Sequence, residues 1–456
     1  MSCFKMEPVL SSADLDRIED AAIRILGEIG LQVPNPGILE ALSHKAGLQV
    51  NGERVTFDRA AILEILPQVK GCAGYDTHVL AGGYASNFMD PATDEIRPGT
   101  VEDLISQVKI MEALGVGVVA PIVVMDIQGP MQEIRMERLT HEYARKSYGS
   151  SQITHIVSAE AGLEMSELVG RPHGLELWTD SPLKMNGNCL KMAWGLRHLK
   201  PKIRIAGMPT IGMSSPLSMF ATFAQSVAEC LGSMAVMKFA GFDDVSFRID
   251  AFDCYTVDMK SANPLVNGPE YLRMLIISNE IARRYGIKNP PGKCLMTTSQ
   301  RPDAQAAAEK AGQCMAAALT GADHFMAAGM LGMSESFSPI QLIIDLEIIK
   351  FIDAFTRPFE LEKDPMIDLL KEVGPGGLFM DQDSTVSGMR DFYWKPDLFV
   401  YNALFSWVAE GAKSTTDRAK EVLAAIKVSD EPVVSPEVSA ELDRIEKHYS
   451  AKLAAL

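Results

Sequence analysis

The sequence predicts an α/β protein built on a (β/α)8 TIM barrel, with a helical extension before the barrel and further helices after it. From Val101 onward, helical patterns alternate with short apolar runs, which is typical of parallel strands packed by helices. Seven or eight such units in about 250 residues favour a closed barrel over an open doubly wound sheet. We expect a helical region with a Gly-rich loop over 1–100, the barrel core over 101–355, and barrel closure with C-terminal helices over 356–456.

The first hundred residues predict three helices. Segment 11–30 opens with serine and aspartate, which favour helix N-caps, and apolar residues then recur at helical spacing up to Gly30. A second helix is expected within 35–47, and a short strand leading into a third helix within 53–66. Segment 81–100 is rich in glycine, has no periodicity, and is expected to be a loop.

The barrel region offers seven candidate strands, and an eighth has no clear place. Between them lie amphipathic segments of helical period, at 101–114, 216–237, 268–286 and 302–321. The expected strands lie within 115–126, 150–158, 182–190, 202–212, 244–252, 293–299 and 322–330.

Composition excludes several classes of function. The formal charge of −16 argues against nucleic acid as a partner. The N-terminus has no signal-peptide core, and no run reaches the length of a membrane span. The seven scattered cysteines, without CxxC, HExxH or HxH, indicate neither a disulfide framework nor a metal site. "GPGG" and "GVGV" lack the GxGxxG pattern, so no nucleotide is expected. We expect a cytoplasmic protein with reduced thiols.

The last expected strand points to the site. It carries His324 and opens into the loop "LGMSESFSP", which contains Glu335 and Phe337. Active sites of barrel enzymes lie at the carboxyl ends of the strands, so we expect this loop to line the site.

At these residues the chain resembles a known family. The order PDAQ, an Ala-rich helix ending in GAD, a Gly-Leu loop and then S-x-x-Q-L-x-x-D-x-E, all within 302–348, resembles the trimethylamine:corrinoid methyltransferases. Further resemblance lies in segments 10–33, 97–104, 207–233, 257–270 and 370–379. The founding members carry pyrrolysine in the loop after this strand, whereas here the loop reads "MLGMSES". The chain is therefore similar to the branch without pyrrolysine, whose best-known members are glycine betaine:corrinoid methyltransferases.

This resemblance implies a function. The chain would move a methyl group from a small quaternary amine, with glycine betaine first, to the Co(I) of a corrinoid carried by a partner protein, giving dimethylglycine. Proline betaine, carnitine, γ-butyrobetaine or a thioether-like donor are alternatives, as is a barrel that binds betaine without turnover. A cationic nitrogen leaves as a neutral amine, so no catalytic side chain and no covalent intermediate on the protein are expected. Whether the chain forms a homo-oligomer is left open.

Aromatic faces suit a trimethylammonium group, which cannot donate hydrogen bonds. The candidates are Tyr84, Phe88, Tyr255 and Phe337, each with ordinary packing as the alternative. Glu335 could attract the cation or be a helix-start acid facing water.

The carboxylate of a betaine needs hydrogen-bond donors, and His324 is the first choice, with a core histidine as the alternative. His155 is second. Arg248 could anchor the carboxylate or pair with Asp250 or Asp244. Asp303 and Gln305 are expected to cap the next helix. Met326, Met330 and Met333 are expected to pack, although flexible methionines also suit an adaptable cavity.

Overall fold

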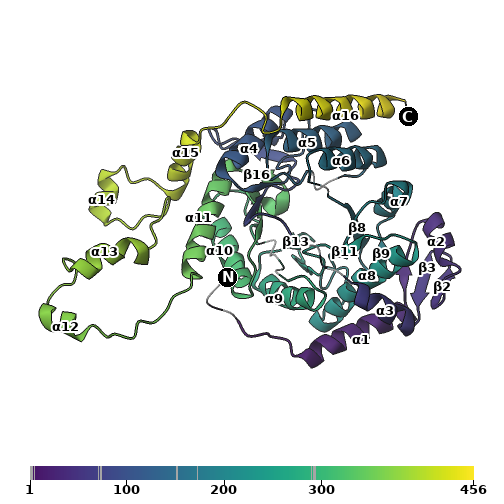
Figure 1. The fold of residues 1–456 in the computed structure, drawn as a ribbon, viewed down its shortest axis with the longest axis horizontal. Helices are drawn as coiled ribbons and strands as arrows, with labels where there is room; N and C mark the ends of the chain where they lie inside the picture. Colours follow the sequence, from purple (N-terminus) through teal and green to yellow (C-terminus); the bar gives the residue numbers. More distant parts are fainter. Residues whose placement is uncertain are drawn as a thin grey trace.

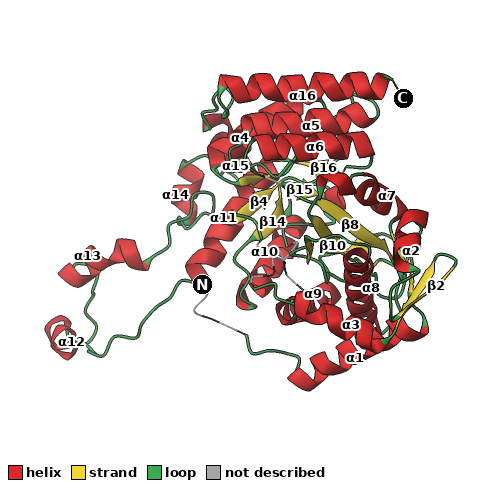
Figure 2. Ribbon diagram, turned by 45° about the vertical axis from the view of Figure 1, so that its right-hand side comes forward, coloured by secondary structure: helices red, strands yellow, loops and turns green. Residues whose placement is uncertain are grey.

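The computed structural model describes residues 4, 6–69, 71, 74–149, 153–171, 173–288, 290 and 294–455. The chain is a mixed α/β protein in which most strands lie at the centre with helices around them, while the strands of the N-terminal hairpin lie at the edge (Figures 1 and 2). The strands form short sheets rather than one continuous closed ladder among the described residues.

The three helices and the one strand predicted for the N-terminal region are present, and two further short strands, at Leu31–Gln32 and Leu48–Asn51, join them. Ser11 caps the first helix in a capping box with Asp14, and Gly30 follows that helix with φ 79°. Asn35 caps the second helix by accepting from the amide of Ile38. The elements are α1 (Ser12–Glu28), β1 (Leu31–Gln32), α2 (Pro36–Leu42), β2 (Leu48–Asn51), β3 (Arg54–Phe57) and α3 (Arg59–Ile65), followed by the short η1 (Leu66–Gln68).

One group of parallel strands has the order β14-β4-β7, formed by β14 (Phe325–Ala328), β4 (Val79–Ala81) and β7 (Gly117–Val118). A parallel bridge from Val118 to Ser147 extends this group by one segment. On the other side, the amide of Leu295 donates to the carbonyl of Met326, 3.1 Å apart. These contacts place five segments side by side in a curled sheet, in the order Leu295, β14, β4, β7 and Ser147.

A second group contains β8 (Leu175–Asp180), β10 (Ile203–Ala206) and β11 (Val245–Phe247), again all parallel. Gly71 forms a parallel bridge with Phe247 at its edge. At the other end β8 turns back into β9 (Lys184–Met185), which leads through β1 to the N-terminal hairpin.

These two groups correct several expectations. The first parallel strand, β4, begins at Val79 and enters the segment expected to be a loop. Segment 153–158 is no strand, because the helix α6 begins at Ile156, and the third strand position is taken by Ser147 instead; residues 150–152 lie outside the described part. The fourth strand is β8, ahead of the expected 182–190, where β9 and a helix lie. The structure thus shows two separate groups of parallel strands, and no pairing among the described residues closes them into a barrel.

The connecting helices cover the outside of the strands, and three of them, α5, α6 and α7, lie where no helix was expected. The helices are α4 (Val101–Leu114), α5 (Pro130–Tyr143), α6 (Ile156–Leu168), α7 (Gly187–Gly195), α8 (Met219–Phe239), α9 (Pro269–Arg284), α10 (Ala304–Leu319) and α11 (Pro339–Phe355), with the short η2 (Arg197–Leu199).

Helix α8 is long and apolar enough to cross a membrane by length and composition. However, 83% of its most apolar 18-residue window is buried inside the structure, and it packs against α1. Its apolar surface is thus covered by the protein's own core, as expected for a central helix of a globular fold.

The C-terminal hundred residues divide into two parts. After α11 the chain runs outward through α12 (Ile367–Val373), α13 (Asp383–Phe392) and α14 (Leu404–Ala409), which project from the rest of the molecule (Figure 1). The chain then returns through α15 (Thr415–Ala425), which packs on α11, and α16 (Pro436–Ala454), which packs on α5 and α6.

Candidate functional site

Two small strand pairs stand beyond the carboxyl ends of β4 and β14. They are β5 (Asn87–Met89) with β6 (Ile96–Pro98), and β15 (Met330–Leu331) with β16 (Ser336–Phe337). β16 and β5 run parallel, with Phe337 opposite Phe88. We call these two strand pairs, β5–β6 and β15–β16, the support. Both rings are buried, Phe337 completely, so two of the four predicted aromatic contacts lie inside the support rather than on its surface.

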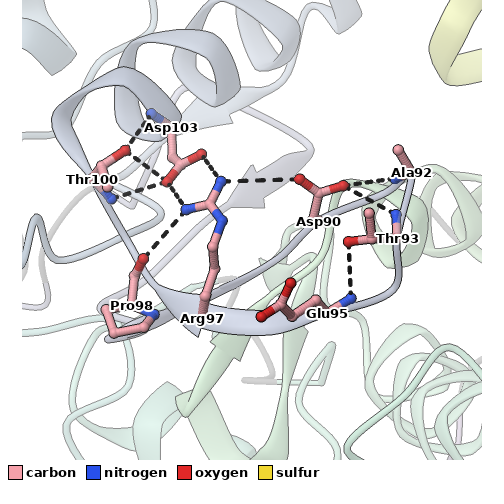
Figure 3. A network of polar contacts seen from close by, with 8 residues as sticks. All are labelled: Asp90, Ala92, Thr93, Glu95, Arg97, Pro98, Thr100 and Asp103. Atoms are coloured by element: carbon pink, nitrogen blue, oxygen red, sulfur yellow. Dashed lines mark hydrogen bonds and ion pairs between the residues drawn. The ribbon is translucent and has the colours of Figure 1, made fainter.

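The support is anchored to α4 by the Arg97 network, the residues drawn in Figure 3. Arg97 donates to both oxygens of Asp103, at 2.6 and 2.8 Å, and its guanidinium lies 5.2 Å from the centroid of the Phe88 ring. Thr100 caps α4 and also contacts Asp103. Burial alone would raise the pKa of Asp103, but Arg97 and Thr100 more than offset it and hold that pKa below its usual range.

Gly99 completes this anchor. A Cβ at Gly99 would lie 1.9 Å from Cγ2 of Ile122, which is too close for any side chain. The segment 97–104, which carries the family resemblance, therefore has a structural explanation: arginine, glycine, threonine and aspartate together lock β6 against α4.

Glu335 lies on the loop between β15 and β16 and is exposed. Its carboxylate accepts from Nε2 of Gln300, 3.2 Å away, and its carbonyl accepts from the amide and the side chain of Asn87. Tyr84, 43% exposed, follows Gly83, whose Cβ would lie 3.0 Å from Cε of Met330. Glu335 and Tyr84 are thus carried by adjoining loops, and both remain accessible.

The loop before Glu335 is strained. Gly332, Met333 and Ser334 have φ values of 55°, 57° and 75°, so three successive residues adopt left-handed backbone. Left-handed backbone at residues other than glycine costs on the order of 1–3 kcal/mol each and tends to gather at functional sites. A Cβ at Gly332 would lie 2.4 Å from Oε1 of Gln300, so only glycine lets Gln300 approach.

Gln300 and its neighbours were missed from the sequence. Asn267 and Gln305 both donate to the hydroxyl of Thr298, at 2.8 and 3.1 Å, and Gln305 also reaches Glu309. Gln305 is therefore not a helix cap, whereas Asp303 caps α10 as expected by accepting from Ala306. The signal that could have found these residues is their position just after an expected strand, where amides and hydroxyls replace apolar residues.

Arg248 directly follows β11 and is almost fully buried. Its guanidinium pairs with Asp250, at 2.7 Å, and with Glu176, and lies 4.7 Å from the centroid of the Trp178 ring. Burial opposes the charge, but the two carboxylates outweigh it and raise the pKa of Arg248 well above its usual value. The alternative of pairing with Asp250 is confirmed, whereas Asp244 pairs with Arg204 instead.

His324 stands immediately before β14, at the amino end of that strand. Its Nδ1 lies 3.0 Å from a carboxylate oxygen of Asp323, and its buried Nε2 has no hydrogen-bond partner among the described residues. Burial lowers the pKa of His324 from its usual value. Nε2 and the Cδ1 of Ile249 both lie 3.0 Å from where a Cβ of Gly74 would be, so His324 is near the segment that follows Arg248.

The remaining predicted contacts lie elsewhere. Tyr255 is buried on the loop after β11, where it bridges Thr210 and packs edge-on against Tyr271. His155 caps α6 by accepting from the amide of Val157, so its role is to start a helix. Of the methionines, Met330 is fully buried and Met326 nearly so, as packing requires.

The S-x-x-Q-L-x-x-D-x-E motif also has a structural role. Ser338 caps α11, and the fully buried Asp345 accepts from Lys310, Gln341 and the amide of Gly329, at 2.7–2.8 Å. Asp345 thereby fixes the end of β14 from which the Glu335 loop departs. Glu347 accepts from three successive amides at 397–399 and ties the returning C-terminal segment to α11.

One group of side chains could hold a metal ion: Glu137 and His141 on α5 with His173 before β8, whose ligand atoms lie within 4.8 Å of one another. This group could not be predicted from the sequence, because it matches none of the short zinc motifs.

Comparisons with known proteins find one matching family model and several distant relatives. A family model described as trimethylamine methyltransferase (MTTB) matches residues 2–452. The glycine betaine methyltransferase of Desulfitobacterium hafniense (strain Y51) is 24% identical over 95% of each chain. The trimethylamine methyltransferase MttB of Desulfitobacterium hafniense (strain DSM 10664 / DCB-2) is 22% identical, over 94% of this chain and 90% of its own. The solved monomethylamine methyltransferase (MtmB) of Methanosarcina barkeri has a TM-score of 0.43 at 10% identity and covers 93% of this chain and 96% of its own.

Proposed function

Because the chain belongs to the trimethylamine methyltransferase (MTTB) family, we propose that it transfers a methyl group from glycine betaine to a corrinoid on a partner protein, leaving dimethylglycine. The observation that carries this substrate is the match with a glycine betaine methyltransferase along 95% of both chains. The loop at 330–336 supports this choice of substrate, because it contains standard residues only. The family members that the resemblance associates with tertiary amines carry pyrrolysine in this loop.

The chemistry requires positioning more than proton transfer. A quaternary nitrogen is already cationic, so its methyl group leaves behind a neutral amine. The reduced corrinoid supplies the nucleophile. The task of this chain is therefore to bind the donor, orient one methyl group outward and exclude water.

We assign the cationic end of the substrate to the accessible residues Tyr84 and Glu335. An aromatic face and a carboxylate both attract an ammonium that has no proton to donate. Gln300 holds the carboxylate of Glu335 in place, at 3.2 Å. Phe88 and Phe337, paired across β5 and β16, support this surface from beneath, in keeping with their burial, whereas Tyr255 is buried on the loop after β11.

His324 is our first candidate for holding the carboxylate, with Arg248 second. The open Nε2 of His324 favours this role, whereas the two acids on Arg248 leave that residue largely neutralised. His324 lies at the amino end of β14 and the Glu335 loop leaves the carboxyl end, roughly 13 Å away along the strand, which is farther than one glycine betaine reaches. Binding at His324 is therefore the alternative to binding at Tyr84 and Glu335, and a variant of His324 decides between the two. Replacing His324 with Ala should raise the KM for glycine betaine strongly in a folded protein. Unchanged kinetics would make His324 a core residue.

The remaining expectations follow from this assignment. We propose that the two groups of parallel strands are parts of one (β/α)8 barrel, and that the protein acts in the cytoplasm with a separate corrinoid protein. No nucleotide, nucleic acid or membrane enters the proposed reaction.

A donor screen tests the function. The protein is mixed with reduced cobalamin and, separately, glycine betaine, proline betaine, carnitine, γ-butyrobetaine and trimethylamine, while the oxidation state of cobalt is followed by absorbance. We expect loss of Co(I) absorbance with glycine betaine and little with trimethylamine. Turnover of trimethylamine alone would overturn the substrate, and betaine binding without turnover of any donor would indicate a binding protein.

A further inference from the structure

We propose that Glu137, His141 and His173 bind a divalent transition-metal ion, with Zn²⁺ as the first candidate, and that this ion joins α5 to the start of β8. Glu137 and His141 are four residues apart on α5, so they lie one turn apart on the same face of the helix. His173 comes from a different part of the chain, two residues before β8. Two imidazoles and a carboxylate are a common protein ligand set for zinc.

The distances fit such an ion. Oε1 of Glu137 lies 3.0 Å from Nε2 of His141 and 3.5 Å from Nε2 of His173. Around a tetrahedral zinc, with bonds of about 2.0–2.1 Å to nitrogen and oxygen, neighbouring ligand atoms lie roughly 3.4 Å apart. The two imidazole rings are nearly parallel, at 14°, with centroids 6.3 Å apart, so both can direct an edge toward the carboxylate.

A second layer of contacts orients one of the ligands. Nδ1 of His141 lies 2.7 Å from the hydroxyl of Ser147. When Nδ1–H donates to that hydroxyl, the lone pair of Nε2 faces Glu137 and is available to a cation. Ligating histidines usually have such a partner on the other ring nitrogen, and it fixes the tautomer that binds.

The surroundings leave room for the carboxylate and a path for the ion. A Cβ at Gly149, whose φ is 68°, would lie 2.3 Å from Oε1 of Glu137, so a larger residue there would displace this carboxylate. Glu137 and His141 are buried, whereas the His173 side chain is 25% exposed. An ion can therefore enter past His173 and remain sheltered by the other two ligands.

The position suggests a structural task. Along the chain, the parallel segments come in the order β4, β7, Ser147 and β8. Among the described residues, no strand pairing joins the segment at Ser147 to β8. The ligand group lies at this break. His173 lies at the amino end of β8, opposite the ends from which the Glu335 loop departs. The ion would thus hold two parts of the fold together, and its binding does not depend on methyl transfer.

The direct test is metal binding to the full chain. Protein stripped with a chelator is titrated with Zn²⁺ in competition with a chromophoric chelator, and its thermal midpoint is recorded with and without Zn²⁺. We expect one tightly bound ion per chain and a higher midpoint. The variant His173→Ala should lose at least tenfold in affinity and the zinc-dependent rise, while the matched control His198→Ala, at an exposed histidine, should behave as wild type.

A second variant keeps the test decisive if His173→Ala folds poorly. Ser147→Ala leaves all three ligands in place and should weaken Zn²⁺ binding by roughly 10–100-fold, as loss of a ligand's hydrogen-bond partner typically does. Wild-type protein that binds no Zn²⁺ stoichiometrically, or that binds it equally well with and without His173, overturns the proposal.

Discussion

The body of the molecule and its C-terminal arm contain similar apolar residues but cover them very differently. We call residues 357–396 and 400–413 the arm; it includes α12, α13 and α14, and none of these three helices has a buried residue. In the body, Phe337 is completely buried, whereas in the arm Phe405 and Leu361 are 86% and 87% exposed. This difference shows that apolar residues stabilise this chain only where strands and helices bury them away from water.

The largest effect is expected inside the body, at the buried pair Lys310–Asp345. Both side chains have no exposure, and Nζ lies 2.8 Å from Oδ2. Lys310→Met leaves a buried carboxylate without its cation and should cost roughly 3–5 kcal/mol of unfolding free energy. Urea unfolding measures this loss.

The double variant Lys310→Met with Asp345→Asn provides the control for that pair. Its neutral amide can still serve Gly329 or Gln341, so most of the stability should return. An equal loss in the single and double variants would show that the lost charge pairing is not the cause.

Two phenylalanines sharpen the comparison directly. Phe337→Ala empties a packed position in the body and should cost about 3–5 kcal/mol. Phe405→Ala removes the same ring from the exposed arm and should change the unfolding free energy by no more than about 0.5 kcal/mol. Equal losses, measured by the same unfolding curves, would mean that another surface covers the arm in solution.

The junction between the two regions should respond to Glu347. Its carboxylate accepts three amides at 397–399 and is 2% exposed. Glu347→Gln keeps the shape but removes the charge, and should cost about 1–3 kcal/mol because hydrogen bonds to a charged acceptor are the stronger ones. Limited proteolysis should then cut first near 397–399. Unchanged cleavage sites and rates would contradict this anchoring role.

The smallest effect is a pH dependence at His78, which links the start of β4 to α11. The hydrogen bond to Asp353, with both oxygens 3.0 Å from Nε2, raises the pKa of His78 above 6.5 although burial opposes it. The resulting stability is fully present below pH 6.5 and fades as the pH rises through the folded-state pKa. Since the pair is half exposed, His78→Gln should remove less than about 1 kcal/mol, and only at the acidic end. A loss that is the same at pH 6 and pH 9 would refute the ion pair.

The elements that could be predicted from the sequence are those with strong local signals. The serine N-cap of the first helix, the second helix within 35–47 and the long helix at 216–237 are all present, because each is fixed by neighbours in the chain. The strands β4 and β7 are only three and two residues long, and their identity comes from pairing with distant segments. No periodicity can reveal so short an element, so β4, which ends where the Gly-rich stretch begins, was not predicted.

The position of the expected loop could be predicted from the sequence, but the contacts of its side chains could not. The loop at 331–339 lies beyond the end of β14, with Glu335 exposed on it. However, whether Phe88 faces a substrate or a neighbouring strand depends on how β5 pairs with β16. This register, which sets Phe88 opposite Phe337, cannot be predicted from the sequence. Gln300 was missed for the same reason, since its partner Glu335 lies 35 residues further along the chain.

The most direct test of the methyl-transfer function uses glycine betaine labelled with ¹³C in its N-methyl groups, together with reduced cobalamin and the purified protein. Methylcobalamin and dimethylglycine are quantified in the same sample by NMR. We predict equal amounts of the two, labelled methyl on cobalt, and slower formation at low substrate concentration for Glu335→Gln, with a KM about tenfold higher. Recovery of all the betaine unchanged, while the protein is folded and the cobalamin remains reduced, would contradict the account.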